Sequence, residues 1–125
     1  MTQVKKGACH CGAVEFEVTL EGAIQRGARC NCSLCRRKGA VMVLVPRDNI
    51  KIVQGEDKLT LYQWNLNIAR HYFCSVCGIY THHQRRSDPN GCGFNVACLE
   101  DVDPYAIEEI TMVDGASLSV AEEAS

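Results

Sequence analysis

The sequence lacks any apolar run long enough to cross a membrane, and it lacks a surplus of positive charge. A membrane-spanning helix needs about 20 consecutive apolar residues, so we expect no membrane segment. The formal net charge is -2, and aromatic residues make up 6% of the chain. Nucleic-acid binding depends on clustered Lys and Arg, often interleaved with aromatic side chains. The composition therefore disfavours nucleic acid as a partner.

The pattern of a secreted, disulfide-stapled domain is also missing. Residues 1–7 include Lys5 and Lys6, but no long apolar stretch follows them, as it does in a signal peptide. The chain has nine cysteines, whereas a secreted disulfide framework favours an even number. In a reducing compartment, clustered thiols more often hold a metal ion. We therefore expect a cytoplasmic protein whose cysteines bind metal.

Short segments with strand character dominate what remains. From residue 14 to residue 20, apolar side chains alternate with Glu15, Glu17 and Thr19, which is the period of a strand with one buried face. Residues 41–45 are continuously apolar, which favours a strand buried on both faces. Further strands are expected at residues 50–52, 59–64, 68–73, 79–84, 94–99 and 110–113, with a loop at 21–29, turns at 54–57, 65–67 and 87–91, and one helical turn at 103–105.

This succession of short strands and turns predicts a mainly β protein with two sheets, sandwich-like and with little helix. A length of 125 residues is typical of one domain. We therefore assign residues 1–117 to a single domain and residues 118–125 to a C-terminal tail.

Seven of the nine cysteines fall into three tight clusters, which are Cys9 with Cys11, then Cys30, Cys32 and Cys35, then Cys74 with Cys77. Cysteines two or three residues apart can place both sulfurs about 2.3 Å from one Zn²⁺. A structural zinc has four protein ligands, and a catalytic zinc keeps one position open. The two pairs together would complete a four-sulfur site, and the triple would bind a second ion with three thiolates. Other groupings are compatible with the sequence, and a histidine or Cys98 could close the triple.

Three cations, Arg36, Arg37 and Lys38, directly follow the triple. A zinc ion with three thiolates carries a net charge of about -1, which a cationic rim could offset while attracting an anionic ligand. A solvated basic turn is the alternative interpretation. Together with Arg70, these residues are candidates to contact substrate carboxylates.

Cys92 and Cys98 fall outside these clusters, and the chain also has four histidines, which are His10, His71, His82 and His83. We expect Cys98 to be a small buried hydrophobe in a strand and Cys92, after a turn, to be partly exposed. The histidines are expected at the surface or in hydrogen bonds. His82 and His83 are adjacent, so in a strand their side chains point to opposite faces.

Taken in order, the motifs resemble those of the glutathione-dependent formaldehyde-activating enzyme (GFA) family, whose domain also occurs in centromere protein V. The match spans residues 7–105. The matching segments are Cys9-His10-Cys11-Gly12, Cys30-Asn31-Cys32-Ser33-Leu34-Cys35-Arg36, Ala69-Arg70-His71-Tyr72-Phe73-Cys74-Ser75-Val76-Cys77-Gly78, Arg86-Ser87-Asp88-Pro89-Asn90 and Asn95-Val96-Ala97-Cys98-Leu99-Glu100.

The resemblance implies a zinc-bearing β fold called a β-tent, with two zinc ions per chain. It implies that Cys9, Cys11, Cys74 and Cys77 hold a structural zinc and that Cys30, Cys32 and Cys35 hold a catalytic one. The implied activity is the condensation of glutathione with formaldehyde to S-hydroxymethylglutathione, a carbon-sulfur lyase reaction. Asn31 stands where many family members carry histidine, a departure that leaves the metal ligands intact and bears on substrate preference.

Two functional hypotheses follow. In the first, an enzyme binds a thiol such as glutathione at the open zinc, lowers its pKa and holds it beside the carbon of an aldehyde. In the second, both ions only stabilise a non-catalytic protein-binding module, a view supported by the lack of an obvious general acid or base beside the triple. A nucleic-acid-binding zinc ribbon is a weaker third alternative.

Overall fold

The computed structural model describes residues 2–63, 69–85 and 90–114. Its longer elements are β1 (Thr2–Ala8), β2 (Glu15–Glu21), β3 (Arg26–Cys30), α1 (Ser33–Lys38), β4 (Met42–Pro46), β5 (Ile50–Gln54), β6 (Leu59–Tyr62), β7 (Arg70–Cys74), β8 (Tyr80–Gln84), β9 (Gly91–Asn95) and β10 (Glu109–Val113). Single 3-10 turns are η1 (Arg47–Asn49), η2 (Glu56–Lys58), η3 (Val96–Cys98) and η4 (Pro104–Ala106).

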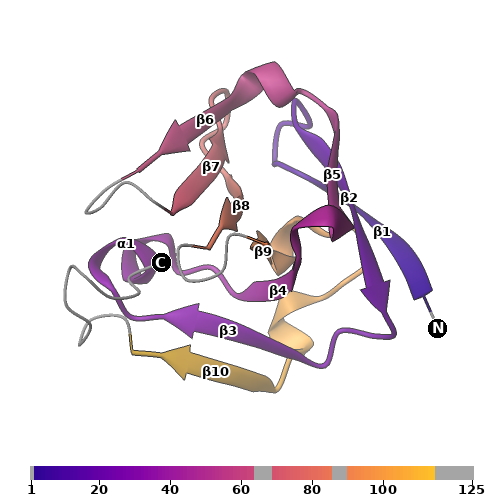
Figure 1. Cartoon of the computed structure of the whole chain (residues 1–125), viewed down its shortest axis with the longest axis vertical. Coiled ribbons are helices and arrows are strands. Elements are labelled where there is room, and N and C mark those ends of the chain that lie inside the picture. Colours follow the sequence, from indigo (N-terminus) through magenta and orange to yellow (C-terminus); the bar gives the residue numbers. More distant parts are fainter. Residues whose placement is uncertain (1, 64–68, 86–89, 115–125) are drawn as a thin grey trace.

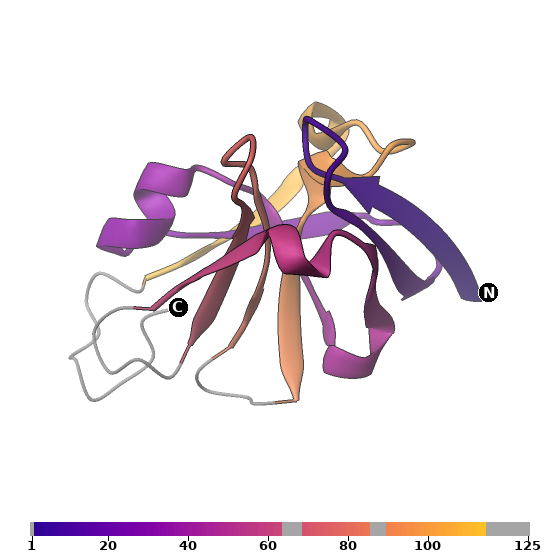
Figure 2. The same cartoon turned by 90° about the horizontal axis from the view of Figure 1, so that it is seen from above.

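The strands form two sheets, which confirms the expected mainly β, two-sheet fold. One sheet has the order β1-β2-β5 and the other the order β10-β3-β4-β9-β8-β7-β6. Neighbouring strands are antiparallel except β10 and β3, which are parallel. Figures 1 and 2 show the larger sheet bending around one side of the molecule, with the smaller sheet set against it. At the top of Figure 1, β5 passes through η2 into β6 and so joins the two sheets.

The main core lies between these sheets. Phe16, Val18 and Leu20 of β2 are buried, as their alternation predicts, and they pack with Phe94 of β9 and Ile107 in one apolar cluster. The rings of Phe16 and Phe94 meet at a centroid distance of 6.4 Å. Fully burying a side chain of this size stabilises the fold by about 1.5–3 kcal/mol. Both sheets contribute to this core. The assignment of residues 1–117 to one domain stays a prediction, and its proposed tail at 118–125 lies outside the described residues.

Several strands match their sequence-based expectations. β2, β5, β8 and β10 lie where predicted, and β7 and β8 form an antiparallel hairpin. The expected helical turn is η4, where the side chain of Asp103 accepts a hydrogen bond from the backbone N–H of Tyr105. Parts of the strands expected at 59–64 and 68–73, and of the turns expected at 65–67 and 87–91, fall outside the described residues.

Other expectations were wrong. Residues 26–29, assigned to a loop, belong to β3, because β10 pairs with it from about 80 residues further along the chain and such a partner leaves no local pattern. The strand expected at 94–99 ends at Asn95, whose side chain accepts a hydrogen bond from Ala97 and starts η3, which contains Cys98. β1 and α1 were not anticipated.

The strand β4 is not buried on both faces. The side chain of Leu44 is 45% exposed, because one face of β4 borders a pocket that Met42 and Leu44 help to line. A continuous apolar run can therefore mark a pocket wall as well as a doubly covered strand. Cys92 is more buried than expected, because it is only 6% exposed.

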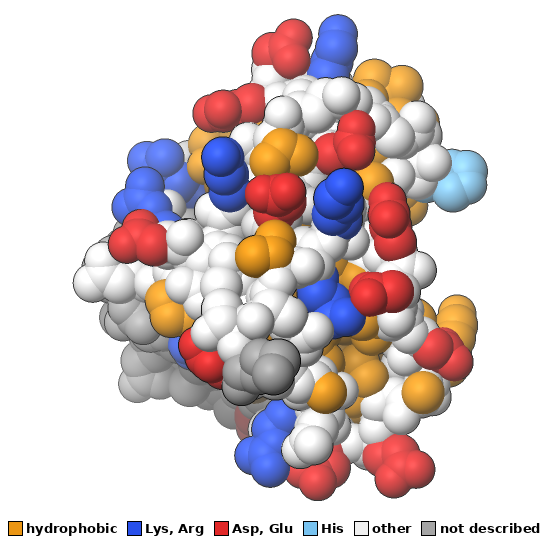
Figure 3. Space-filling view, turned by 90° about the vertical axis from the view of Figure 1, so that its right-hand side faces the viewer, with side chains coloured by type: hydrophobic (Ala, Val, Ile, Leu, Met, Phe, Trp, Pro, Cys, Tyr) orange, Lys and Arg blue, Asp and Glu red, His pale blue; other side chains and the backbone are white. Residues whose placement is uncertain are grey.

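The surface agrees with the charge balance of the sequence. On the face shown in Figure 3, acidic and basic side chains are interspersed rather than gathered by sign. None of the helices in the described part of the chain combines the length and apolarity that a membrane crossing requires.

Candidate metal centre and adjoining pocket

Four cysteines from two distant hairpin turns meet in one cluster. Cys9 and Cys11 follow β1, Cys74 ends β7, and Cys77 lies in the turn before β8. Their sulfur atoms all lie within 4.8 Å of one another, and Sγ of Cys11 is 3.7 Å from Sγ of both Cys9 and Cys74. A tetrahedron of sulfurs with bonds of about 2.3 Å to Zn²⁺ has edges of about 3.8 Å. The donor set therefore fits a closed zinc site.

Backbone amides prepare this four-sulfur cluster for negative charge. Val14 N–H donates to Sγ of Cys9 at 3.3 Å, and Val76 N–H donates to Sγ of Cys74 at 3.4 Å. Backbone hydrogen bonds from Cys11 and Ile79 lower the pKa of Cys77 to about 6. Such bonds favour thiolates, which are the form that binds metal.

The remaining three clustered cysteines lie around the start of α1. Cys30 ends β3, and Cys32 caps the helix by accepting a hydrogen bond from Cys35 N–H at 3.3 Å. Cys32 N–H donates in turn to Sγ of Cys30 at 3.4 Å. The three sulfurs lie within 4.8 Å of one another. Burial raises the pKa of both Cys30 and Cys35. Holding three thiolates here therefore calls for a compensating cation, and Zn²⁺ suits an all-sulfur set.

The triple has three donors among the described residues, and the candidates to close it lie elsewhere. Sγ of Cys98 is buried and contacts the carbonyl oxygen of Tyr80 at 3.7 Å. Nδ1 of His83 lies 2.6 Å from the Tyr80 hydroxyl, and Nδ1 of His71 lies 3.0 Å from Nζ of Lys38. As expected, these histidines take part in hydrogen bonds. All nine cysteines are free of disulfides.

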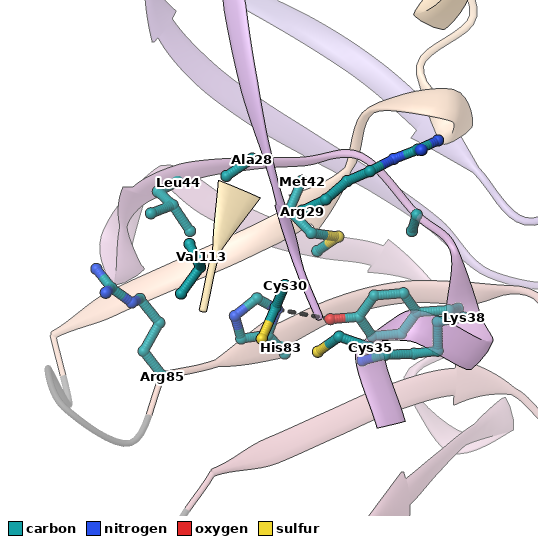
Figure 4. Close-up of a pocket in the computed structure, with 12 residues that line it drawn as sticks. Ala28, Arg29, Cys30, Cys35, Lys38, Met42, Leu44, His83, Arg85 and Val113 are labelled. Carbon is teal, nitrogen blue, oxygen red and sulfur yellow. Dashed lines mark hydrogen bonds between the residues drawn. The ribbon is translucent and has the colours of Figure 1, made fainter. Parts of the chain in front are cut away.

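The three-sulfur cluster opens onto a partly open pocket, which is shown in Figure 4. Cys30 and Cys35 line it directly. An apolar wall comes from Ala28, Ala40, Met42, Leu44 and Val113, and the polar lining comes from Arg29, Lys38, Tyr80, His83 and Arg85. Apolar walls with a few converging polar groups are typical of small-molecule sites.

Of the four predicted substrate-contacting cations, one reaches this pocket. Lys38 lines it, with Nζ 3.6 Å from the centroid of the Tyr80 ring. Arg36 and Arg37 are exposed on α1, where Arg37 donates to the carbonyl of Ser33, and Arg70 is exposed at the start of β7. Lys38 differs from Arg36 and Arg37 because successive side chains of a helix such as α1 point to different sides.

Sequence reasoning missed four polar residues of the pocket: Arg29, Tyr80, His83 and Arg85. Arg29 directly precedes Cys30, which is a signal that could have identified it. The other three lie on or after β8, about 50 residues from the triple, and no local pattern connects them to it. Burial lowers the pKa of His83 to about 3 and raises that of Tyr80, so both side chains are neutral near pH 7.

A mainly β, two-sheet fold with one four-thiolate cluster and one three-thiolate cluster beside a pocket defines the class of this protein. A family profile described as glutathione-dependent formaldehyde-activating enzyme matches residues 4–113. The chain therefore belongs to the GFA family.

Individual relatives agree with this assignment. Proteins of Talaromyces marneffei and Fusarium vanettenii, each named "Putative glutathione-dependent formaldehyde-activating enzyme", are 32% and 33% identical over 76 residues. These matches cover 58% of this chain and 40% of each relative, so the matched region is about two fifths of their length. A crystal structure of a Rhodobacter sphaeroides protein superimposes with a TM-score of 0.81 at 49% identity, covering 86% of this chain and 99% of that one.

Proposed function

We propose that the chain is a zinc-dependent enzyme of the carbon-sulfur lyase type. Its substrate is the adduct of a thiol, such as glutathione, with formaldehyde or a related aldehyde, and it forms or cleaves the C–S bond of that adduct. The observation that carries this proposal is the position of the three-sulfur cluster, two of whose cysteines line a pocket that is also lined by the cations Lys38 and Arg85. The four-sulfur cluster already has a full set of donors.

The different roles of the two clusters, one structural and one catalytic, follow from the number of sulfur donors in each. Cys9, Cys11, Cys74 and Cys77 hold a structural zinc that ties the N-terminal segment to the β7–β8 hairpin. Cys30, Cys32 and Cys35 hold the second of two zinc ions. This ion supplies Lewis acidity that favours the thiolate form of a substrate thiol. We place the protein in the cytoplasm, because clustered thiols that hold metal ions are typical of a reducing compartment.

The chain's own side chains orient the two reactants. Glutathione carries two carboxylates, and the pocket offers Lys38 and Arg85 as partners for them. Met42 and Leu44 give the pocket an apolar wall, which reduces the contact of bound reactants with water. Coordination to zinc would weaken a substrate thiolate as a nucleophile, so the placement of the two reactants by the side chains of the pocket must supply much of the acceleration.

The test is magnetisation exchange by NMR among formaldehyde, glutathione and their adduct. Catalytic amounts of zinc-loaded protein should speed this exchange, and a Cys32→Ser variant should return it to the spontaneous rate. Exchange that stays at the spontaneous rate with wild-type protein would refute the proposed reaction.

A second measurement separates the enzyme from the binding module. In cobalt-substituted protein, glutathione should shift the visible spectrum saturably if the second metal keeps an open position. An unchanged spectrum together with spontaneous exchange would favour the module.

A further inference from the structure

We propose that Tyr80 is a catalytic residue of this site, and that its hydroxyl donates a hydrogen bond to the oxygen of the aldehyde or hydroxymethyl group. His83 is the positioning residue that holds this hydroxyl in place. The inference rests on the proposed function, and it supplies the polar group that the sequence did not reveal beside the three cysteines.

Tyr80 belongs to the pocket onto which the three-sulfur cluster opens. Tyr80 is 9% exposed and lines the same pocket as Cys30 and Cys35. Burial raises its pKa, so the phenol keeps its proton. A phenol that stays protonated can donate to an oxygen bearing developing negative charge.

The hydrogen bond between Tyr80 and His83 leaves the phenol proton available. The hydroxyl oxygen of Tyr80 is 2.6 Å from Nδ1 of His83, the bond dashed in Figure 4. His83 is neutral at pH 7 because burial lowers its pKa to about 3, so one ring nitrogen carries a proton. In the Nδ1–H tautomer His83 donates to Tyr80, and the Tyr80 proton then points to an acceptor in the pocket. A bound oxygen selects this tautomer.

His83 is held by its neighbours on both adjoining strands. His83 lies on β8 and is directly opposite His71 of β7 on one side and Gly93 of β9 on the other. The three residues therefore form one row on one face of the sheet. The rings of His71 and His83 stack at a centroid distance of 5.6 Å. A Cβ at position 93 would lie 2.5 Å from Cε1 of His83. The ring therefore occupies the space that a side chain at residue 93 would fill.

The chemistry balances with this single donor. In the synthetic direction the thiolate sulfur forms a bond to the carbonyl carbon, and the π electron pair of the C=O bond moves to the oxygen. Tyr80 stabilises that oxygen by its hydrogen bond. The proton that the thiol released to solvent returns to the oxygen and completes the hydroxyl group. Cleavage follows the same steps in reverse, with the C–S electron pair returning to sulfur.

The decisive variant is Tyr80→Phe, with Tyr72→Phe as its matched control. Tyr72 lies on the neighbouring strand, stacks on His82 and lines a different cleft. We expect Tyr80→Phe to lower kcat about 100-fold with less than a twofold change in the KM for glutathione, as loss of one oxyanion donor does. Tyr72→Phe should leave both constants unchanged. Zinc content and thermal midpoint establish that each variant is folded.

A binding measurement tests the same hydrogen bond without turnover. Calorimetry should show that Tyr80→Phe binds S-hydroxymethylglutathione, kept in excess formaldehyde, about five- to tenfold more weakly than wild type. Its affinity for S-methylglutathione, which lacks the oxygen, should be unchanged. A loss of equal size for both ligands would overturn the assignment by showing a merely structural role.

The positioning role of His83 has its own readout. His83→Ala should lower kcat about tenfold, and His83→Gln, whose amide can still donate, should recover part of that loss. Equal rates for these two variants would refute the positioning role. If wild-type protein shows no exchange activity, the proposed reaction fails, while the comparison of the two ligands still decides whether Tyr80 contacts the oxygen.

Discussion

Replacing Gly55 by alanine should destabilise the protein far more than the same replacement at Gly22. Both glycines have a positive φ, of 78° and 83°. An alanine in this conformation costs about 1 kcal/mol at either position. A Cβ at Gly22 would meet nothing within 4 Å, whereas a Cβ at Gly55 would overlap the carbonyl oxygen of Ala13 and lie 2.8 Å from its carbon. Forcing extra volume against backbone adds roughly 1–3 kcal/mol.

The added strain at Gly55 falls on the four-sulfur cluster, which is the proposed structural zinc site. Ala13 and Val14 lie next to the four-sulfur cluster, where Cys9 N–H donates to the Val14 carbonyl at 3.0 Å and Val14 N–H donates to Sγ of Cys9 at 3.3 Å. Gly55→Ala should therefore lower the free energy of unfolding by about 2–4 kcal/mol and also speed the release of zinc to a chelator. Gly22→Ala should leave zinc release unchanged.

Thermal denaturation with saturating zinc measures the difference. At roughly 3 °C per kcal/mol for a domain of this size, Tm should fall by about 3 °C for Gly22→Ala and about 6–12 °C for Gly55→Ala. Equal shifts for the two variants, or unchanged zinc release from Gly55→Ala, would contradict the reasoning.

Three further outcomes are expected. Cys32→Ser should lower the metal content from about two zinc ions per chain to about one. The fold should be retained, because serine can still accept the hydrogen bond from the N–H of Cys35. Elemental analysis measures the zinc and circular dichroism the fold, and either unchanged zinc content or an unfolded variant would contradict this expectation. Lys38→Met should weaken glutathione binding about tenfold in calorimetry, whereas Arg36→Met, on an exposed residue, should not, and similar losses would argue against a pocket role for Lys38. Burial lowers the pKa of His82 from 6.5 to about 4, so its contribution to stability is complete above pH 6.5 and declines as the pH falls towards 4. When the pH is lowered from 7 to 5, the free energy of unfolding should fall by about 2 kcal/mol more in wild type than in His82→Phe, as measured by urea titration at each pH. Parallel pH profiles for the two proteins would rule this out.

Much of the strand content could be predicted because the signal is local. The alternation from Val14 to Leu20 needs only the pleat of a strand to bury one face, and β2 buries that face. β3 could not be predicted in this way, because its partner β10 joins it from the far end of the described chain. The exposure of Leu44 depends on a pocket, which no periodicity encodes.

The cysteines of the candidate site show the same contrast between local spacing and tertiary structure. Spacing places Cys30, Cys32 and Cys35 around one helix start, because sulfurs two and three residues apart share a turn. The grouping of the two cysteine pairs was one of several that the sequence allowed, and it follows from the meeting of the β1–β2 and β7–β8 turns in space.

By itself, then, the sequence determined the two local cysteine pairs, the local cysteine triple and the strand-rich class, since all of these depend on neighbours within a few residues. The tertiary structure alone decided that Lys38 faces the pocket while Arg36 and Arg37 do not, and that Tyr80 and His83 stand beside the three cysteines. The physical reason is that a pocket is lined by segments from separate strands, whose proximity arises from sheet pairing and core packing rather than from spacing along the chain.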